Sequence, residues 1–242
     1  MDWTDQGIVL SARRHGEAAA VASLLTRAHG RHAGLVRGGW GKRGRAILQS
    51  GNTVQAHWRA RLSEHLGTFV LEPEQPFAAG VFNDPLRLAA LASACALADC
   101  ALPEREPHPA VHDALGHLLA ALVGEDSGWP EVYVRWEIRL LADLGFGLDL
   151  KRCAQTGTES NLAFVSPRTG RAVSADGAGP WRDRLLPLPG FLGGAEPNLA
   201  IDSITQGLAL TAHFLERHVF APHGRALPAA RQRLAALRLV AD

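Results

Sequence analysis

Short apolar runs alternate with glycine-rich turns over the first 75 residues of the chain. Gly16, Gly30, Gly51 and Gly67 fall between these runs or at their ends, where turn residues are expected. Five short strands leave exposed edges unless their sheet closes, so the pattern predicts a small five-stranded barrel. Residues 46–51, AILQSG, are expected to form a short helical turn between the third and fourth strands. The five runs lie in QGIVLSARR, AVASLLTR, HAGLVRGG, NTVQAHWRA and LGTFVLE.

The hydrophobic period becomes helical after residue 80. Asp84 and Pro85 have the positions of an N-cap and of a first helical residue, and a run rich in Ala and Leu follows them. Two more runs, over residues 109–124 and 130–145, begin with a proline and end with a glycine. Two further helices are expected over residues 201–220 and 228–240.

An irregular segment from about residue 150 to 196 interrupts the helices, because it is rich in glycine and proline. Its sequence LAFVSPRTGRAV predicts two short strands around a Pro–Gly turn. Its larger apolar side chains are expected to dock on the helices: Phe164, Val165, Trp181, Leu186 and Leu188. The predicted fold class is therefore α+β. A barrel domain of residues 1–80 precedes an all-α helical domain of residues 81–242 that contains this insertion.

Composition narrows the class of protein. Hydrophobic residues make up 47% and charged residues 20%, as in soluble globular proteins. No apolar run reaches the length of about 20 residues that crosses a bilayer. The first ten residues hold two acids and no basic residue, unlike a secretory signal, so we expect a cytoplasmic protein. Cys95, Cys100 and Cys153 form no disulfide framework, and we expect the first two to pack as small apolar side chains.

Charge is distributed unevenly along the chain, although its net value is only +1. Residues 11–61 hold ten basic side chains and one acidic side chain, a net charge of +9. Residues 83–242 hold 15 basic and 18 acidic side chains, a net charge of −3. A basic N-terminal third beside a mildly acidic remainder indicates two domains with different tasks.

The most basic stretch is LVRGGWGKRGRAI, residues 35–47, in which four glycines separate the cationic side chains. Its spacing matches neither a P-loop nor a dinucleotide-binding turn. Cations on a glycine-rich loop suit binding to a nucleic-acid backbone, where they displace condensed counterions. The alternative is a solvated charged face. The predicted nucleic-acid-binding residues are Arg13, Arg14, Arg37, Trp40, Lys42, Arg43, Arg45, Arg59 and Arg61.

Two tryptophans lie in or near this basic region. Trp40 either stacks on bases, a contact that contributes about 1–3 kcal/mol per base in such sites, or anchors the loop to the barrel. Trp58 is expected in the barrel core.

No catalytic constellation is visible. The 11 histidines include no H-E-x-x-H pair, no G-x-S-x-G motif is present, and the acids are scattered. Cys153 begins CAQTG, but a structural zinc site needs four ligands and the partner position holds Thr156. We therefore expect no catalytic site, no metal and no cofactor.

Several stretches, in this order, resemble the RecO family of bacterial recombination mediators over nearly the full chain. They are Gly7–Leu10, Arg37–Arg43, Leu144–Asp149 with Cys153, and Arg217–Arg225. The resemblance implies an OB-fold, a helical domain and an inserted segment that is a zinc knuckle in some members. This chain departs from the zinc-bearing pattern, since it also lacks a second C-x-x-C pair near residues 172–178.

The resemblance also implies a function. RecO proteins bind single- and double-stranded DNA, anneal complementary strands, and act with RecR to load recombinase onto DNA coated with single-strand-binding protein; they break no bonds. It implies a nucleoid-associated protein whose basic surface includes Arg13, Arg37, Lys42, Arg43 and Arg45. Candidates for contact with the tail of single-strand-binding protein are Arg135 and Arg139, although Arg135 has Glu131 and Glu137 as alternative partners.

Two other classes stay open at this point. One is a barrel protein that binds structured RNA, which competition between DNA and RNA strands separates from a DNA-binding protein. The other is a small-molecule enzyme, which requires a closed apolar pocket lined by converging polar groups.

Overall fold

The computed structural model describes residues 1–195 and 200–237, which form helices and a five-stranded sheet, in agreement with the predicted mixed α and β class. Two compact units are present. The first comprises residues 1–125 and 228–234, and the second holds most of residues 126–227. The two long helices that follow the barrel therefore belong to the same compact unit as the barrel. The division at residue 80 into a DNA-binding domain and a helical domain stays a prediction.

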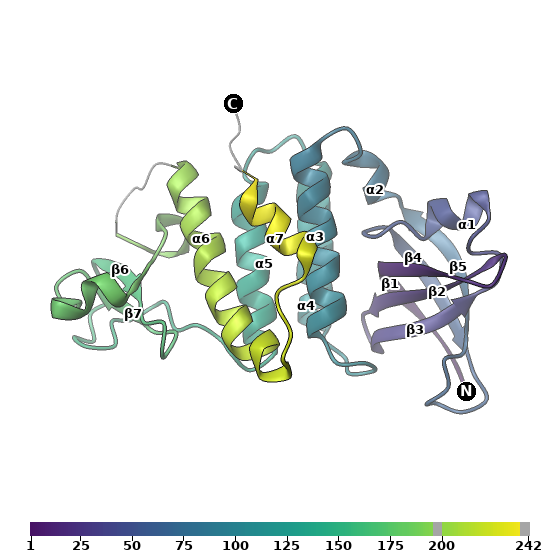
Figure 1. Ribbon diagram of the computed structural model, residues 1–242, viewed down its shortest axis with the longest axis horizontal. Helices are drawn as coiled ribbons and strands as arrows, with labels where there is room; N and C mark the ends of the chain where they lie inside the picture. The colour runs from purple at the N-terminus through teal and green to yellow at the C-terminus, as the bar shows by residue number, and fades with distance from the viewer. Residues whose placement is uncertain (196–199, 238–242) are drawn as a thin grey trace. The chain divides into compact units, whose positions relative to one another are not determined.

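The first unit begins with a closed barrel, whose strand order is β1-β2-β3-β5-β4 (Figure 1). Neighbouring strands are antiparallel except β3 and β5, which run parallel and are joined by only two residue pairs, Leu35 with Thr68 and Val36 with Phe69. The strands are β1 (Asp2–His15), β2 (Ala19–Thr26), β3 (Gly30–Val36), β4 (Thr53–Arg59) and β5 (Thr68–Gln75).

The barrel core is apolar and centres on Trp58, which is only 2% exposed, as predicted. Its indole Nε1 donates a hydrogen bond to the carbonyl oxygen of Leu66 at 3.0 Å, so the buried polar atom is satisfied. Gly67 has φ +67°, and a Cβ there would lie 2.4 Å from that same nitrogen. Only glycine therefore allows the chain to turn against the tryptophan.

Three helices follow the barrel in the first unit, α2 (Phe77–Gly80), α3 (Pro85–Ala101) and α4 (Pro109–Val123). Helix α3 contacts β1 and β2, α4 contacts β2, and α2 contacts α4. The predicted cap of α3 is confirmed, because the Asp84 carboxylate accepts hydrogen bonds from the amides of Leu86 and Arg87 at 3.0 Å. Asp99 of α3 accepts hydrogen bonds from the hydroxyls of Ser11 and Ser23, which joins the helix to the barrel.

The second unit contains α5 (Trp129–Asp143) and α6 (Ala200–Phe214), which contact each other. A π-helical turn, η3 (Leu215–Phe220), and a short turn, η4 (Ala221–His223), continue α6. The last helix, α7 (Ala229–Ala236), matches the prediction for residues 228–240 in its described part, and positions 238–242 lie outside the described residues. Within the described ranges, no helix combines the length and apolar character needed to cross a membrane.

The insertion between α5 and α6 forms a small sheet of order β7-β6-β8. The two predicted strands are present as β6 (Leu162–Val165) and β7 (Ala172–Ser174), and β8 (Leu186–Pro187) is an addition that the sequence pattern did not indicate. Two turns, η1 (Gly179–Arg184) and η2 (Gly190–Leu192), complete its described part, since the predicted end at residue 196 lies outside the described residues.

A thiol stands at the centre of this insertion. Cys153 is buried, and its sulfur accepts hydrogen bonds from the Ser174 amide at 3.2 Å, the Ser174 hydroxyl at 3.3 Å and the Thr156 amide at 3.4 Å. Burial raises the pKa of the thiol, but these hydrogen bonds outweigh it and lower the pKa to about 6.

Three local predictions were wrong. Cys95 is buried as expected, but Cys100 is exposed at the end of α3. Trp181 is 58% exposed instead of docking on helices, whereas Val165 and Leu188 are buried. A short helical turn was expected over residues 46–51, but the helix that is present, α1, begins earlier and spans Lys42–Ile47.

Candidate nucleic-acid interface

The stretch after β3 is a tight turn followed by the short helix α1. The turn closes through hydrogen bonds from the Gly39 amide to the Val36 carbonyl at 3.2 Å and from the Gly41 amide to the Gly38 carbonyl at 3.0 Å. Helix α1 packs directly on this turn, since a Cβ at Gly44 would lie 2.5 Å from the Gly38 carbonyl oxygen. The glycines thus hold α1 against the turn instead of forming a mobile loop.

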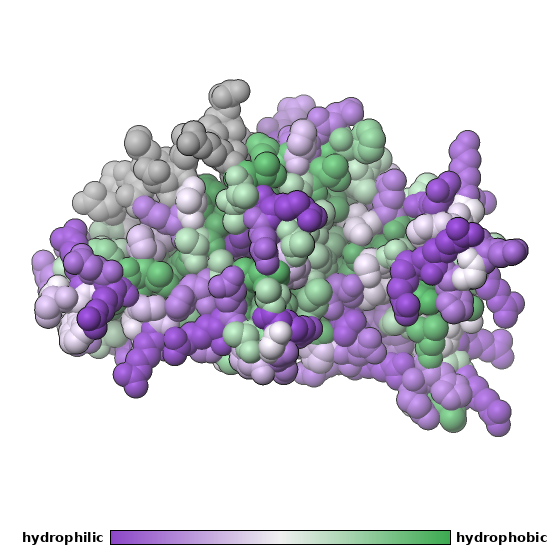
Figure 2. Space-filling model, in the orientation of Figure 1, coloured by the Kyte–Doolittle hydropathy of each residue, from purple (hydrophilic) through white to green (hydrophobic). Residues whose placement is uncertain are grey.

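Three basic side chains project from this element. Lys42, Arg43 and Arg45 are exposed, and α1 has no buried residue. Figure 2 shows strongly hydrophilic side chains gathered over the region of α1. The short helix therefore presents its cations to solvent from a fixed backbone.

Trp40 ties this stretch to the hairpin between β1 and β2. Its amide donates a hydrogen bond to the Ala18 carbonyl at 2.9 Å, and its half-buried side chain packs against the barrel core. This is the anchoring alternative of the two that the sequence left open. A stacking role for Trp40 stays a prediction.

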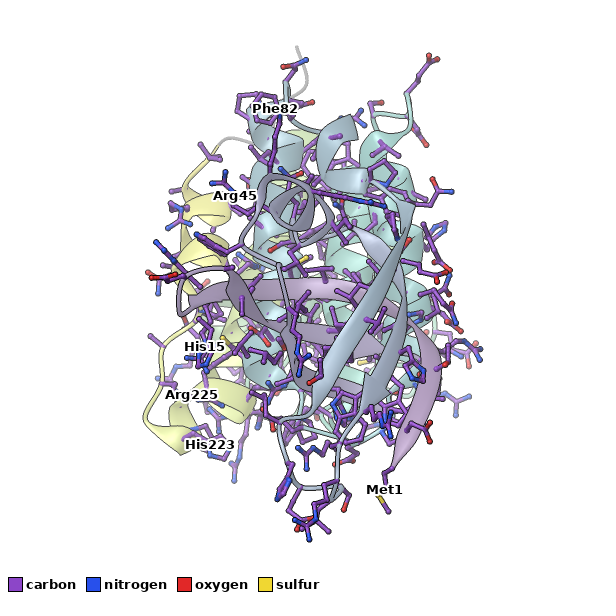
Figure 3. The ribbon with its side chains drawn as sticks, turned by 90° about the vertical axis from the view of Figure 1, so that its right-hand side faces the viewer. Met1, His15, Arg45, Phe82, His223 and Arg225 are labelled. Atoms are coloured by element: carbon purple, nitrogen blue, oxygen red, sulfur yellow. The ribbon has the colours of Figure 1, made fainter. Side chains whose placement is uncertain are left out.

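The β1–β2 hairpin carries Arg13 and Arg14, both exposed. Arg14 donates hydrogen bonds to the Gly16 carbonyl at 3.0 Å and the Glu17 carbonyl at 3.3 Å, which brace the hairpin turn. Figure 3 shows His15, next to this pair, on the same side of the barrel as Arg45 of α1.

Strand register connects these side chains to the other predicted ones. One row of paired residues runs across the strands from Arg14 to Ala20, Val36, Phe69 and Trp58. The other arginines predicted to bind DNA are sequence neighbours of this row or lie close beyond it. They are Arg13, Arg37, Arg59 and Arg61. The basic side chains that the sequence scatters over 49 residues therefore lie on or near one continuous row of cross-strand pairs, which we call the rim. It begins at the end of β1 and reaches β4, where Arg59 pairs with Asp2 at the start of β1.

Two shallow hollows follow this rim. Arg37 and Arg59 line one of about 420 Å³ together with His57, Thr68 and Val70. Arg59 and Arg61 line another, of about 640 Å³, with His65 and the chain start. Sequence reasoning did not place His57, Thr68 and Val70 beside the two arginines, because their proximity depends on strand register alone.

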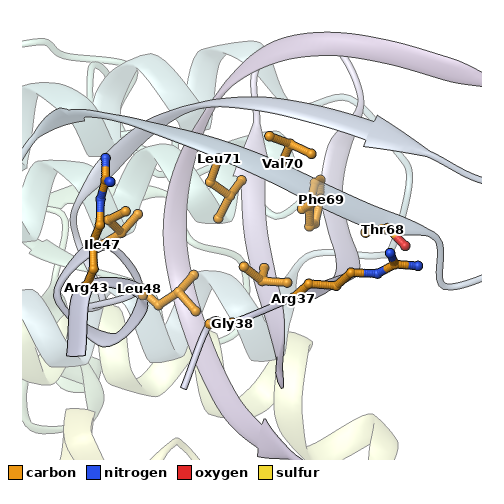
Figure 4. Close-up of a pocket in the computed structure, with 12 residues that line it drawn as sticks. Arg37, Gly38, Arg43, Ile47, Leu48, Thr68, Phe69, Val70 and Leu71 are labelled. Atoms are coloured by element: carbon orange, nitrogen blue, oxygen red, sulfur yellow. The ribbon is translucent and has the colours of Figure 1, made fainter. Parts of the chain in front are cut away.

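A third hollow, of about 410 Å³, separates α1 from β5 (Figure 4). Its walls are apolar and include Ile47, Leu48 and Leu71, and Arg37 and Arg43 stand at opposite ends of it. Phe69 also lines this hollow, and its pairing with β3 is the last residue pair between β3 and β5. An apolar groove with a cation at each end suits a ligand that alternates apolar and anionic groups.

Two arginines of the basic N-terminal third of the chain are already engaged in ion pairs within the protein. Arg27 forms a two-point ion pair with Asp113 at 2.9 and 3.0 Å, and Arg31 contacts Asp99 at 3.6 Å and Glu104 at 3.3 Å. These two arginines join the barrel to α3 and α4. By contrast, none of the basic side chains on α1 or the rim has a carboxylate within ion-pair distance among the residues that the structure describes.

The two candidates for partner contact lie on α5. Arg135 is within 3.4 Å of Glu131, and Arg139 is within 3.9 Å of Asp143. Arg135 also lies over the ring of Phe191, 5.6 Å from its centroid. Both arginines are exposed on their outer side, and their role in partner binding stays a prediction.

Across the described residues, no group of three or more His, Cys, Asp and Glu side chains is placed to hold a metal ion. The most perturbed histidine is in the barrel core, where burial, with the charges of Arg105 and His29, lowers the pKa of His32 to about 4. Its ring nitrogens have no hydrogen-bond partner among the described residues, and Trp58 and Trp3 surround it. His32 is thus packed among aromatic rings in the barrel core.

Comparison with known proteins covers both units. A family model described as Recombination protein O N terminal matches residues 1–77, and one described as Recombination protein O C terminal matches residues 83–226. DNA repair protein RecO of Rhodospirillum centenum is 61% identical over 235 residues, which are 96% of this chain and 93% of that protein. The proteins of the same name from Rhodospirillum rubrum and Phenylobacterium zucineum are 54% and 51% identical, over 96% of this chain and 94% and 95% of their own.

Proposed function

The chain belongs to the RecO family of DNA repair proteins, and from this premise we propose that its barrel rim binds single- and double-stranded DNA and anneals complementary strands. The family inferred from the sequence is confirmed. The observation that carries the proposal is the row of exposed cations on α1 and the rim, which has no carboxylate beside it among the described residues.

The topology supports this proposal. A closed five-stranded barrel with a helix between β3 and β4 is the arrangement of an OB-fold, and we assign the barrel to that class. OB-folds bind oligonucleotides on a strand face flanked by loops. Here the hairpin after β1, the stretch around α1 and the chain after β4 supply the corresponding cations.

Annealing follows from charge neutralisation. Two complementary strands repel each other through their phosphates, and cations along the rim lower this repulsion while leaving the base edges free to pair. Nothing in this step requires ATP or breaks a bond, so we propose that the protein is not an enzyme. We further propose that it acts in the cytoplasm at the nucleoid, with RecR, to load recombinase on DNA coated with single-strand-binding protein.

The rim is tested by replacing Arg37, Lys42 and Arg43 with alanine together. The variant should weaken binding to all DNA sequences alike and flatten the salt dependence of affinity by about one unit per lost phosphate contact. Fluorescence anisotropy with labelled strands at several salt concentrations measures both. The matched control replaces Lys151, Arg217 and Arg233, which are exposed cations outside the rim. If the two variants bind DNA equally well, the rim is not the site.

The annealing step has its own assay. Complementary strands coated with single-strand-binding protein are mixed with the parent protein and with each triple variant, and duplex formation is followed over time. The parent and the control should accelerate it and the rim variant should not. Competition with RNA strands of equal length checks the choice of DNA, and preferential binding of RNA would overturn it.

We propose Arg135 and Arg139 as contacts for the acidic tail of single-strand-binding protein. The position of Arg135 above the Phe191 ring supports this. The acidic side chains of such a peptide would pair with the cation, and its apolar side chains would pack on the ring. Reversing both charges to glutamate should abolish binding of a labelled tail peptide while leaving DNA affinity of the barrel unchanged. Unchanged peptide binding would contradict the assignment.

A further inference from the structure

The insertion carries a second hollow with the chemistry of a nucleic-acid site. It measures about 590 Å³, and the cationic side chains that line it are Arg168, Arg171 and Arg184, with no acidic side chain in the lining. The indole of Trp181 stands at its edge and is 58% exposed. This surface belongs to the second unit, whereas the rim belongs to the first.

The lining is built on a firm backbone. Arg168 and Thr169 lie on the turn between β6 and β7, which closes through hydrogen bonds from the Gly170 amide to the Ser166 carbonyl and from the Ser166 amide to the Arg171 carbonyl, both at 2.9 Å. The Pro167 carbonyl oxygen lies 3.0 Å from Nε2 of His213 on α6. The turn is therefore fixed from both sides.

The opposite wall is η1, which carries Trp181 and Arg184. Hydrogen bonds from the Trp181 amide to the Ala178 carbonyl and from the Leu185 amide to the Arg182 carbonyl, both at 3.1 Å, hold this turn. The Arg184 guanidinium lies over the indole, 5.3 Å from its centroid. The structured turn therefore presents an exposed aromatic ring and a cation side by side on the wall of the hollow.

The floor between these walls is apolar and continuous with the thiol core of the insertion. Ala154, Val173 and Ala178 form it, and β7 is attached by the hydrogen bonds to Cys153. Ser166, Thr169 and Gln155 add groups that both donate and accept hydrogen bonds. The size falls in the range of about 300–1,000 Å³ that small organic ligands occupy and far exceeds a single phosphate ion.

We propose that this hollow binds nucleotide units of single-stranded DNA, with a base stacked on Trp181 and the flanking phosphates held by Arg168 and Arg184. Arginine and tryptophan both stack on bases, and every base offers a ring face, so the contact is independent of sequence. Arg171 contributes less, because its Nε lies 3.5 Å from the Asp149 carboxylate. This inference rests on the proposed annealing function and adds a second strand contact, outside the barrel.

The test uses the full chain and a fluorescein-labelled oligo(dT) strand. In the variant that already lacks Arg37, Lys42 and Arg43, we expect Trp181→Ala to weaken the remaining affinity about fivefold or more, the loss of one stacked base. Trp181→Phe should keep most of the affinity, because a ring remains. Phe82→Ala, which removes a 71% exposed ring of the first unit, is the matched control. Thermal unfolding curves confirm that each variant is folded.

The outcomes separate the two proposals. If the parent protein binds no oligo(dT), the proposed function itself fails. If the rim variant loses affinity but Trp181→Ala behaves like Phe82→Ala, only the second contact is overturned. A labelled peptide of aspartate and phenylalanine residues is tested beside the DNA. If Trp181→Ala abolishes peptide binding and leaves oligo(dT) binding intact, the hollow is a peptide site and the proposal is wrong.

Discussion

At the scale of single residues, Gly44 controls whether α1 can lie against the turn that precedes it. A Cβ there meets the Gly38 carbonyl at 2.5 Å and the Gly39 Cα at 2.6 Å, both backbone atoms that cannot rotate away. Gly44→Ala should therefore displace α1 and destabilise the barrel by about 1–3 kcal/mol. Urea unfolding measures this change.

The neighbouring glycine supplies the control. At Gly41 the nearest atom to an added Cβ is the Gly38 carbonyl oxygen at 3.3 Å, so a small shift accommodates it. Gly41→Ala should cost much less stability and retain DNA binding, whereas Gly44→Ala should weaken both. Equal effects of the two substitutions would show that close packing of α1 is unimportant.

His32 makes the barrel sensitive to acid. Its pKa falls from 6.5 to about 4 on folding, mainly through burial, so the unfolded chain binds the proton more readily. The contribution of His32 to stability is complete above about pH 6.5 and is lost as the pH falls toward 4, at up to about 1.4 kcal/mol per pH unit. His32→Phe, which fits among the same rings, should flatten this decline. Urea midpoints measured from pH 4 to 7.5 test it, and parallel curves for the two proteins would refute it.

At the scale of elements, the sequence predicted the features that follow from the local residue pattern. It missed the features that depend on contacts between elements. The strands, the cap at Asp84 and the buried Trp58 follow from periodicity and side-chain type. The start of α1 did not, because three glycines around Lys42 argue against a helix until the turn packs on it. The exposed Trp181 was also missed, since composition assigns a tryptophan to a core and only the structure shows it on the wall of a hollow.

Three positions of the insertion converge on the sulfur of Cys153. Thr156 and Ser174 donate to the Cys153 sulfur, and a Cβ at Gly177 would lie 3.0 Å from that sulfur, so four positions converge. Replacing Thr156, Ser174 and Gly177 with cysteine should therefore create a tetrahedral zinc site of four thiolates. Metal analysis should find one zinc per chain, and Cys153→Ser in the same background should lose it. Equal zinc content in both would contradict the convergence.

At the scale of the whole molecule, the net charge of +1 gives no indication of the basic side chains concentrated along the rim. Eight basic side chains are predicted to contact DNA there, and Arg168 and Arg184 of the insertion are proposed to hold two more phosphates. The log–log slope of affinity against salt should therefore be clearly negative but no steeper than about −7 for a single strand, at about 0.7 per phosphate. Titrations between 50 and 200 mM salt measure the slope. A value near zero would show that local charge does not drive binding.

The two-residue ladder between β3 and β5 has a mechanical consequence for this rim. Every other seam of the barrel is held by a longer run of paired residues, so separating β3 from β5 costs the fewest backbone hydrogen bonds. The apolar groove beside α1 lies directly along this seam. If strand separation begins at the shortest ladder, we expect opening of the barrel to start here and to widen this groove, which hydrogen exchange at the amides of Leu35 and Phe69 would detect. Beyond Phe69, β5 has no further residue paired with β3 among the described residues, and Pro73 in this stretch has no amide hydrogen to offer to another strand.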